Sequence, residues 1–345
     1  MPPSARLAAH RSAFRSALLG WYDERKRDLP WRTHPSLYKT VVSEFMLQQT
    51  QVKTALPYFD RWIRELPDFT TLAAASEDRV LKLWEGLGYY RRARNLRRLA
   101  QALVAIHPAP STAEAWGDLP GVGPYTAAAI TSIAFGAAEA CVDGNVVRTL
   151  ARLTADARPH RNGTSAARSL APLARDLLDP HRPGDHNQAM MELGATVCLR
   201  HNPQCLQCPA APWCSARASG DPERFPLLAP KAVERIEVVR AWCEHDRHLL
   251  LHRAKGESRR LAGIHELPTP DQARLDAGRV RQGSLVCRRT RTITRFHITE
   301  FIHKAPPPQD PLPPDLVWIS IDHIDRIALS GPHRRWITAL LQARK

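Results

Sequence analysis

The chain reads Leu119-Pro120-Gly121-Val122-Gly123-Pro124-Tyr125, continues as an apolar run to Gly136, and then reads Val142-Asp143-Gly144-Asn145. The two glycines of the first stretch allow backbone angles that other residues resist, and its second proline suits the first turn of a helix, where the missing N–H costs nothing. A glycine after the apolar run ends that helix. The stretch therefore predicts two helices joined by a tight turn, followed by an acidic residue.

This turn has two interpretations. A turn that ends at a helix N-terminus presents unpaired backbone N–H groups, which receive a phosphate without any charged side chain. Alternatively, the two helices form a hairpin used only for packing, and Asp143 is the N-cap of a helix that begins at Gly144. The stretch alone does not decide between them.

Composition narrows the class of partner. A chain of 345 residues holds about two domains. Its 49 Lys and Arg exceed its 34 Asp and Glu and give a net charge of +15, which favours a polyanionic partner but does not choose between DNA, RNA and an anionic membrane. No apolar run is long enough to cross a bilayer, so we expect no membrane partner.

From residue 14 to about 197 the pattern is helical, beginning with a helix over 14–22. In the segment 41–52, the polar residues Glu44, Gln48 and Gln51 fall on one helical face. An ordinary amphipathic helix with its polar face in water would have the same pattern of residues. However, the apolar neighbours of Glu44 are expected to desolvate its carboxyl group and to raise its pKa.

A loop with apolar and aromatic residues, 83–90, runs into a basic helix. Loops expose what they carry, so Leu87 and Tyr89 are candidate wedges between base pairs. The arginines that follow are candidate phosphate contacts: Arg91, Arg92, Arg94, Arg97 and Arg98. The alternative is that the aromatic residues are core and that the arginines form a solvated face.

Four of the seven cysteines are clustered, with the spacing C-x6-C-x2-C-x5-C: Cys198, Cys205, Cys208 and Cys214. This spacing indicates one metal site in a reducing compartment, and four thiolates suit either zinc or a [4Fe–4S] cluster. The other three cysteines are isolated, and we expect them to be buried thiols.

The pattern changes near the middle of the chain. Residues 215–234 mix Pro, Ala and charge and are expected to form a linker between a helical domain, 1–214, and a second domain, 235–345. The second domain has β-like runs at 236–242, 248–251, 291–301 and 317–321, and a late helix near 335–341. We expect a small α+β domain.

From about Phe14 to the last strand, the chain resembles the DNA glycosylases that carry a helix-hairpin-helix, and among them the adenine DNA glycosylases of the MutY type. The resemblance rests on the hairpin at about 113–136, the segment 41–52, the sequence Gly-Leu-Gly-Tyr-Tyr at 86–90 and the cysteine spacing. It implies a mainly α catalytic domain with a [4Fe–4S] loop at 198–214. Residues 261–268 are similar to part of the Nudix-related C-terminal domain of that family, without the acidic helix that holds Mg²⁺ in Nudix hydrolases.

The resemblance also implies a mechanism. Breaking the N-glycosidic bond of adenine passes through an oxocarbenium-like state, for which one protonated and one ionised carboxyl group are suited. Glu44 is expected to be the general acid, Asp143 the ionised partner and Asn145 its support. Tyr125 stands where strand-cutting relatives place a Schiff-base lysine, so we expect a monofunctional enzyme.

The remaining site residues follow from the same resemblance. Arg32 and Glu192 are expected to hold the flipped adenine. The space near the opposing base is assigned to Gln49, Thr50, Leu87 and Tyr89, and the DNA contact of the hairpin to Gly121, Val122 and Gly123. The expected partner is double-stranded DNA with adenine opposite 8-oxoguanine or guanine, bound by a monomer in the cytoplasm of a bacterium.

The chain departs from the family at two places. Ile293, Thr294 and Arg295 stand where the family has Phe-Ser-His, and Thr294 retains the hydroxyl that would touch the damaged guanine. His265 stands where Trp is common. Two alternatives are therefore a related glycosylase with another mismatch or pyrimidine substrate, and a mismatch-binding protein without catalysis.

Overall fold

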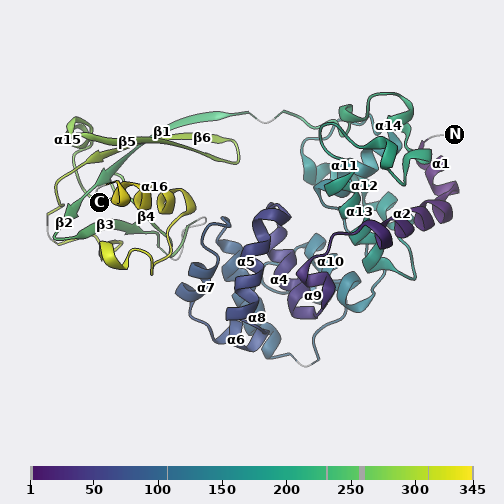
Figure 1. The fold of residues 1–345 in the computed structure, drawn as a ribbon, viewed down its shortest axis with the longest axis horizontal. Coiled ribbons are helices and arrows are strands. Elements are labelled where there is room, and N and C mark those ends of the chain that lie inside the picture. The colour runs from purple at the N-terminus through teal and green to yellow at the C-terminus, as the bar shows by residue number, and fades with distance from the viewer. Residues whose placement is uncertain (1–2, 107, 231, 256–260, 310, 344–345) are drawn as a thin grey trace. The chain divides into compact units, whose positions relative to one another are not determined.

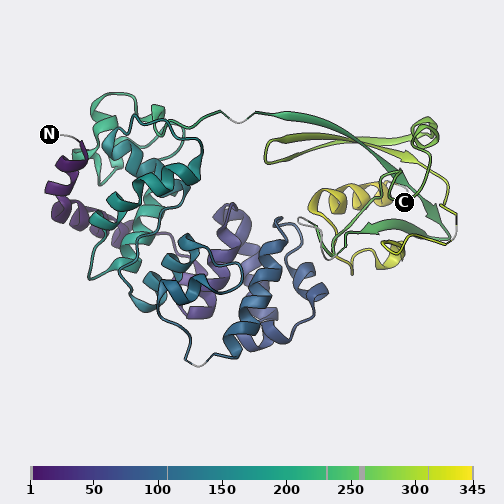
Figure 2. The ribbon, with the colours of Figure 1, turned by 180° about the vertical axis from the view of Figure 1, so that it is seen from behind.

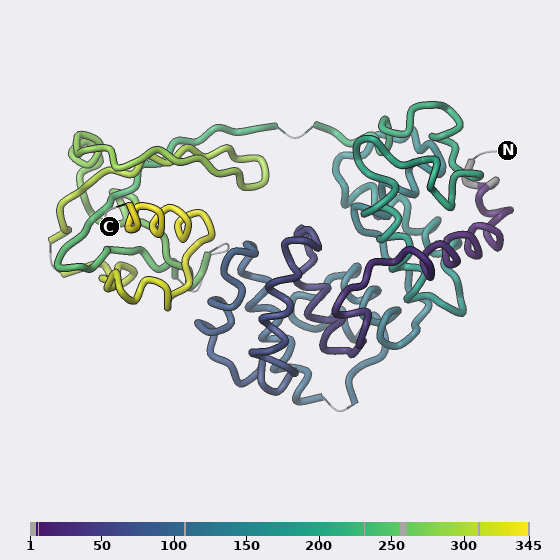
Figure 3. The backbone as a smooth tube through the Cα atoms, viewed as in Figure 1, coloured from purple at the N-terminus to yellow at the C-terminus, as the bar shows by residue number. Residues whose placement is uncertain are grey.

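The computed structural model describes residues 3–106, 108–230, 232–255, 261–309 and 311–343 (Figure 1). The chain folds into two compact units. Unit 1 comprises Met1–Gln48 and Ala105–Pro230, and unit 2 comprises Gln49–Val104 and Lys231–Lys345. The chain therefore passes from one unit to the other at 48/49, 104/105 and 230/231, as the tube of Figure 3 traces.

Unit 1 is built of helices. They are α1 (Pro3–Ala9), α2 (Arg11–Arg25), α3 (Pro30–Thr33), α4 (Leu37–Leu47), α9 (Ala113–Gly117), α10 (Pro124–Phe135), α11 (Gly144–Thr154), α12 (Gly163–Leu177), α13 (Pro183–Thr196) and α14 (Ser215–Ala218), with 3-10 turns η1 (Cys205–Gln207), η2 (Ala211–Trp213) and η3 (Pro222–Arg224). The predicted helix over 14–22 is confirmed within α2.

The core of unit 1 lies where α2 and α11 to α13 meet. Phe14 of α2 and Leu150, Leu170 and Leu193 of the other three helices are almost fully buried in one cluster. Each such side chain contributes about 1.5–3 kcal/mol through burial. Helix α13 also packs against α10, so the core holds the predicted hairpin against its neighbours.

Unit 2 combines helices with two small sheets. Its helices are α5 (Val52–Glu65), α6 (Phe69–Ala74), α7 (Glu77–Leu83), α8 (Arg91–Val104), α15 (Ala277–Gln282) and α16 (Gly331–Gln342), with a 3-10 turn η4 (Ile321–His323). Its strands are β1 (Glu234–Trp242), β2 (Glu244–His245), β3 (His248–Arg253), β4 (His265–Glu266), β5 (Leu285–Ile293), β6 (Phe296–Lys304) and β7 (Leu316–Ser320).

The two sheets enclose a helix. In one sheet β6 lies between β1, to which it is parallel, and β5, to which it is antiparallel; in the other, β3 pairs with β2, β4 and β7. Helix α16 lies between the sheets in both views (Figures 1 and 2), and its Ile337 joins Trp242, Leu251 and Ile302 in the core. The predicted class, a mainly α chain with a small α+β C-terminal part, is confirmed.

The prediction of one β-like run over 291–301 is wrong. The structure has two strands in register, with Ile293 opposite Phe296, joined by a turn at Thr294 and Arg295. Thr294 has a φ of 54°, a left-handed conformation that glycine or asparagine usually supplies in such a turn. Because neither residue is present, the turn has no sequence signal.

Most of the segment predicted as a linker bonds to unit 1. The backbone N–H of His160 donates to the carbonyl of Leu227 at 2.8 Å, and the N–H of Ala229 donates to the carbonyl of His160 at 2.9 Å. Phe225 is buried in the core of unit 1. The predicted domain boundaries at 214 and 235 stay a prediction.

Candidate active site

The hairpin consists of α9, a tight turn and α10. Gly121 has a φ of +79°, which only glycine adopts without strain, and the N–H of Val122 donates to the carbonyl of Leu119 at 3.2 Å. Gly123 is the N-cap of α10 with a φ of −97°, and no atom lies within 4 Å of where its Cβ would be. The requirement for glycine is therefore conformational at Gly121, whereas at Gly123 the backbone is open to a close approach.

Glu44 lies on α4, which packs against α10. Its exposed fraction is 7%. Burial raises the pKa of Glu44 to about 7; a hydrogen bond from Tyr125 and the charge of Arg32 oppose the rise, and the charge of Asp143 adds to it. At neutral pH the carboxyl group is thus divided between its protonated and ionised forms, as a proton donor requires.

Tyr125 stands on the first turn of α10, between Glu44 and α13. Its hydroxyl contacts the Glu44 carboxyl group and lies 3.1 Å from Sδ of Met191. Burial raises the pKa of Tyr125 well above its usual range, so the phenol stays protonated. This side chain has no amine and cannot form a Schiff base with a sugar.

Asp143 is the N-cap of α11, as the packing interpretation predicts. Its Oδ1 accepts from the N–H of Val146 at 2.7 Å, and its Oδ2 accepts from Nδ2 of Asn145 at 3.0 Å. Burial raises the pKa of Asp143, while these hydrogen bonds, which favour the ionised form, oppose the rise. A capping role is compatible with chemistry, because the charge of Asp143 acts on Glu44.

The structure thus brings together the four predicted catalytic residues of unit 1: Glu44, Tyr125, Asp143 and Asn145. They provide one carboxyl group that is partly protonated near pH 7 and one that is held by donors. A carboxyl group that can donate a proton, beside a second whose ionised form accepts hydrogen bonds, is the pair that acid-assisted cleavage of a glycosidic bond uses.

Arg32 and Glu192 form an ion pair beside this site. Nη1 of Arg32 donates to Oε2 of Glu192 at 3.0 Å, and Nε of Arg32 donates to Oε1 of Gln188 at 2.9 Å. Glu192 is 1% exposed and also accepts from Nε of Arg27 at 2.6 Å. Burial raises the pKa of Glu192, but the two arginines outweigh burial, and the net pKa is lowered.

Gln188 and Arg27 were not predicted from the sequence. Gln188 lies four residues before Glu192 on α13, so the two side chains share a helical face, and this spacing was the available signal. Arg27 follows Arg25 and Lys26, and nothing in such a basic run distinguishes one member from another.

The residues predicted to lie near the opposing base belong to unit 2. Thr50 accepts from Nη2 of Arg92 at 3.1 Å, and Gln49 has a φ of 57°. Leu87 is buried, with 6% exposure, whereas Tyr89 is 48% exposed. Of the two predicted wedges, only the aromatic one is presented to solvent.

Thr294 lies at the turn between β5 and β6 and is exposed. Its hydroxyl donates to the carbonyl of Ile293 at 2.7 Å. Next to it, Arg295 forms an ion pair of 2.8 Å with Glu234. His265, the second departure from the family, is buried on β4, and its Nδ1 lies 3.0 Å from the carbonyl oxygen of Ala328.

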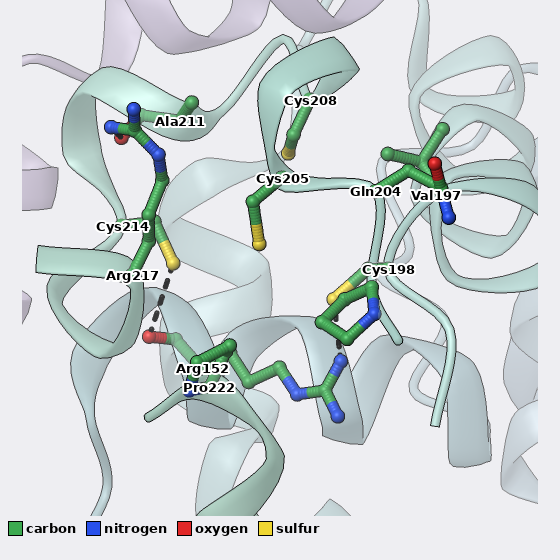
Figure 4. Close-up of a pocket in the computed structure, with 11 residues that line it drawn as sticks. Arg152, Val197, Cys198, Gln204, Cys205, Cys208, Ala211, Cys214, Arg217 and Pro222 are labelled. Carbon is green, nitrogen blue, oxygen red and sulfur yellow. Dashed lines mark hydrogen bonds between the residues drawn. The ribbon is translucent and has the colours of Figure 1, made fainter. Parts of the chain in front are cut away.

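The four clustered cysteines line one small pocket (Figure 4). Figure 4 shows their side chains directed toward the same space, with Arg152 along one wall. Nη1 of Arg152 lies 3.4 Å from Sγ of Cys198 and donates to the carbonyl of Leu199 at 2.6 Å. Four thiolates are the ligand set of a zinc ion and of a [4Fe–4S] cluster alike, so these four cysteines are the candidate ligands of such a group.

Two features are absent from the part of the chain that the structure describes. The described residues contain no group of three His, Cys, Asp or Glu side chains close enough to hold a single metal ion. Among the same residues, no helix has the length and apolarity of a membrane span.

Comparison with known proteins identifies similar chains. Residues 42–172 match the family model of the HhH-GPD superfamily of base excision DNA repair proteins. The chain is 48% identical to the adenine DNA glycosylase of Homo sapiens over 229 residues, 63% of this chain and 42% of that protein. It is 38% identical to the adenine DNA glycosylase of Mycolicibacterium smegmatis over 208 residues, 59% of this chain and 70% of that protein.

Among solved structures, the chain is similar to a thermostable thymine-DNA glycosylase, with a TM-score of 0.53 and 27% identity. The match covers 61% of this chain and 98% of that one. The chain spans less than half the length of the human, mouse and rat relatives, 42% in each case.

Proposed function

Since the chain belongs to the adenine DNA glycosylase family, we propose that it is a monofunctional glycosylase that removes adenine mispaired with 8-oxoguanine or guanine in double-stranded DNA. The observation that carries the proposal is the carboxyl pair of unit 1, in which buried Glu44 has a pKa of about 7 and Asp143 is held by two hydrogen bonds. The net charge of +15 fits a nucleic-acid partner.

In the proposed reaction, the protonated carboxyl group of Glu44 donates to a ring nitrogen of adenine. The bond from the base to the sugar breaks, its electron pair stays with the base, and the sugar becomes an oxocarbenium ion. The carboxylate of Asp143, oriented by Asn145, stabilises that cation. Water then adds to the sugar carbon and gives up a proton to Glu44.

Because Tyr125 has no amine, the proposed reaction ends at the abasic sugar, with the strand intact. The base must leave the duplex before it reaches Glu44, at a cost of a few kcal/mol that is lowest at a mispair. We assign the flipped adenine to Arg32 and Glu192, whose ion pair offers donors and acceptors beside the carboxyl pair.

For the opposing strand, we assign contacts to Gln49, Thr50 and the exposed Tyr89, while the buried Leu87 packs beneath this loop. The phosphate contact is assigned to the turn of the hairpin, Gly121, Val122 and Gly123, since Gly123 leaves the backbone at the start of α10 open. The exposed hydroxyl of Thr294 is assigned to the damaged guanine.

A [4Fe–4S] cluster held by Cys198, Cys205, Cys208 and Cys214 completes the proposal. When bound, the cluster would tie the end of unit 1 together through four thiolate bonds, away from the bond that is cleaved. The expected protein is yellow-brown, contains iron and sulfide, and loses its visible absorption in a Cys205→Ala variant. A colourless protein with one equivalent of zinc would contradict the cluster.

The bacterial cytoplasm, where DNA is accessible and thiols stay reduced, is the proposed location, and the proposed active form is a monomer.

The deciding experiment is single-turnover excision on four duplexes, each assayed with and without alkali. They carry adenine opposite 8-oxoguanine, adenine opposite guanine, adenine opposite thymine, and thymine opposite guanine. The proposal predicts loss of adenine from the first two, with strand cutting only after alkali. Loss of thymine would instead identify a related glycosylase for another mismatch, cutting without alkali would contradict the assignment of Tyr125, and binding without excision would leave a mismatch-binding protein.

A further inference from the structure

Asn187 lies on α13 and is 3% exposed. Its Nδ2 donates to the carbonyl of Glu139 at 2.7 Å and to Oγ of Ser132 at 2.9 Å. Its Oδ1 accepts from the N–H of Cys141 at 3.0 Å. One buried amide therefore connects α13, α10 and the connector, which we define as residues 137–142.

The orientation of this amide is fixed by its partners. The N–H of Cys141 is a donor only and the carbonyl of Glu139 is an acceptor only. If the amide of Asn187 were flipped, its nitrogen would face the N–H of Cys141 and its oxygen would face the carbonyl of Glu139, and neither pair could form a hydrogen bond. The hydroxyl of Ser132 donates to the carbonyl of Ala129 within its own helix, which leaves its oxygen to accept from Asn187. Each hydrogen of the amide nitrogen thus has an acceptor.

The connector depends on such bonds because it is neither helix nor strand. It leaves α10 through Gly136, whose φ of +70° ends the helix, and it leads directly into Asp143 at the N-cap of α11. Downstream, the carboxylate of Asp143 is held by Asn145 and Val146. Upstream of Asp143, Asn187 bonds the backbone of Cys141 and of Glu139, which lie two and four residues before Asp143.

We propose that Asn187 is a positioning residue for base excision: it fixes the connector so that the carboxylate of Asp143 stays in place opposite Glu44. This inference rests on the proposed function. Asn187 itself touches neither carboxyl group through any of these bonds, and its effect passes through the backbone of residues 139 to 141.

Loss of the bonds from Asn187 would let the connector, and with it Asp143, move. That movement should change the pH at which Glu44 titrates. The groups that act on Glu44 are Tyr125 of α10, Arg32 of α3 and Asp143. Asp143 directly follows the connector, and the Cys141 thiol within the connector has its own pKa raised by burial and by the charge of Glu44. If the negative charge of Asp143 moves away, the proton of Glu44 is lost at lower pH, so the alkaline limb of the rate profile moves to lower pH.

Two variants test the proposal. Asn187→Ala removes all three bonds. Asn187→Asp keeps the size of the side chain and the acceptor for Cys141 but loses both donors and adds a negative charge near the site. We expect each to slow excision in the bound complex by about tenfold to a hundredfold, since small misplacements of reacting groups have costs of that size.

The matched control is Asn162→Ala. Asn162 is also in unit 1 and caps α12 by accepting from the N–H of Ser165 at 2.9 Å, away from the connector. Its loss is expected to lower the melting temperature and to leave the excision rate of the folded protein and its pH limb unchanged.

The measurements are the single-turnover rate against pH, the Kd for mispaired duplex, the melting temperature, and the titration of Glu44 followed by carboxyl NMR. In Asn187→Ala we expect the alkaline limb of the rate profile and the NMR titration of Glu44 to move to lower pH, because the charge of Asp143 moves away. In Asn187→Asp we expect both to move to higher pH, because the variant adds a negative charge near Glu44. The Kd should stay within threefold of wild type in both variants. Rates and titrations equal to those of Asn162→Ala would overturn the inference while wild-type excision stands. A wild-type protein without excision would overturn the proposed function, and with it this inference.

Discussion

At the scale of single residues, the chemistry depends on how strongly Glu44 is desolvated. Its pKa of about 7 arises from burial and from the neighbouring charge of Asp143. The sequence predicts the direction of the shift because Glu44 stands in an otherwise apolar segment, with Val41, Val42 and Phe45. The burial itself depends on the packing of α4 against other helices such as α10, which the segment alone does not report.

The first prediction concerns the rate. Glu44→Gln removes the proton donor but keeps the shape, so we expect excision to fall by at least about a hundredfold, with the Kd for mispaired duplex unchanged. The wild-type rate should decline tenfold per pH unit well above pH 7, because the raised pKa keeps Glu44 protonated only below that pH. Excision by Glu44→Gln at the wild-type rate would remove Glu44 from the acid role.

The second prediction concerns stability. The folded protein holds a proton on Glu44 that the unfolded chain releases above about pH 4.5, so this group lowers the free energy of unfolding as pH rises toward 7. Urea unfolding should show that Glu44→Gln gains about 2–3 kcal/mol over wild type between pH 5 and pH 8. A difference that does not change with pH would mean that Glu44 keeps its ordinary pKa.

Sequence reasoning did not reach the partners of these groups. Gln188 and Asn187 act on Arg32 and on the connector, which lie far from α13 along the chain. Periodicity places a side chain on a helical face, but it does not say which remote segment that face meets. Only the packing of α13 against α10 and α2 determines this.

At the scale of elements, the hairpin is predictable because residues that favour helix ends mark its boundaries. Pro124 begins α10 and Gly136 ends it, both as expected. The turn between β5 and β6 was missed because Thr294 takes a left-handed conformation without glycine or asparagine.

The third prediction is that the two glycines of the hairpin have different roles, Gly121 in stability and Gly123 in DNA binding. Gly121→Ala forces an alanine to a φ of +79° and should cost about 1–2 kcal/mol of unfolding free energy. Gly123→Ala has an ordinary φ and open space, so its cost should stay below about 1 kcal/mol, while DNA affinity falls because the added methyl group obstructs the backbone. Chemical denaturation and a DNA-binding titration measure the two effects. Equal losses of stability, or DNA affinity retained by Gly123→Ala, would contradict this division of roles.

At the scale of the whole molecule, the pairing of residues 49–104 with 231–345 was not predicted. It depends on tertiary contacts, such as the hydrogen bond of 2.9 Å from the Tyr90 hydroxyl to the carbonyl of Leu329 and the ion pair between Arg334 and Glu85. No local pattern reports a bond between residues separated by more than 200 positions.

The fourth prediction follows from net charge. With +15 at neutral pH, DNA affinity should fall with added salt, with a slope of log K against log salt of about −0.9 for each phosphate neutralised. The single-turnover rate of the bound complex should not change, because Glu44 is buried. Binding titrations and excision assays across a salt series measure both, and a salt-independent affinity would exclude phosphate contacts as the main source of binding.

The interleaving of the two units also sets an order for biosynthesis. Residues 49–104 leave the ribosome before the second stretch of unit 1 and long before their own partners at 231–345. Unit 1 is therefore the first to be complete, and Cys198, Cys205, Cys208 and Cys214 are among its last residues to emerge. A nascent chain stopped before them contains the carboxyl pair but neither a finished unit nor its thiols, and such fragments should be substrates for proteolysis rather than partly active enzymes.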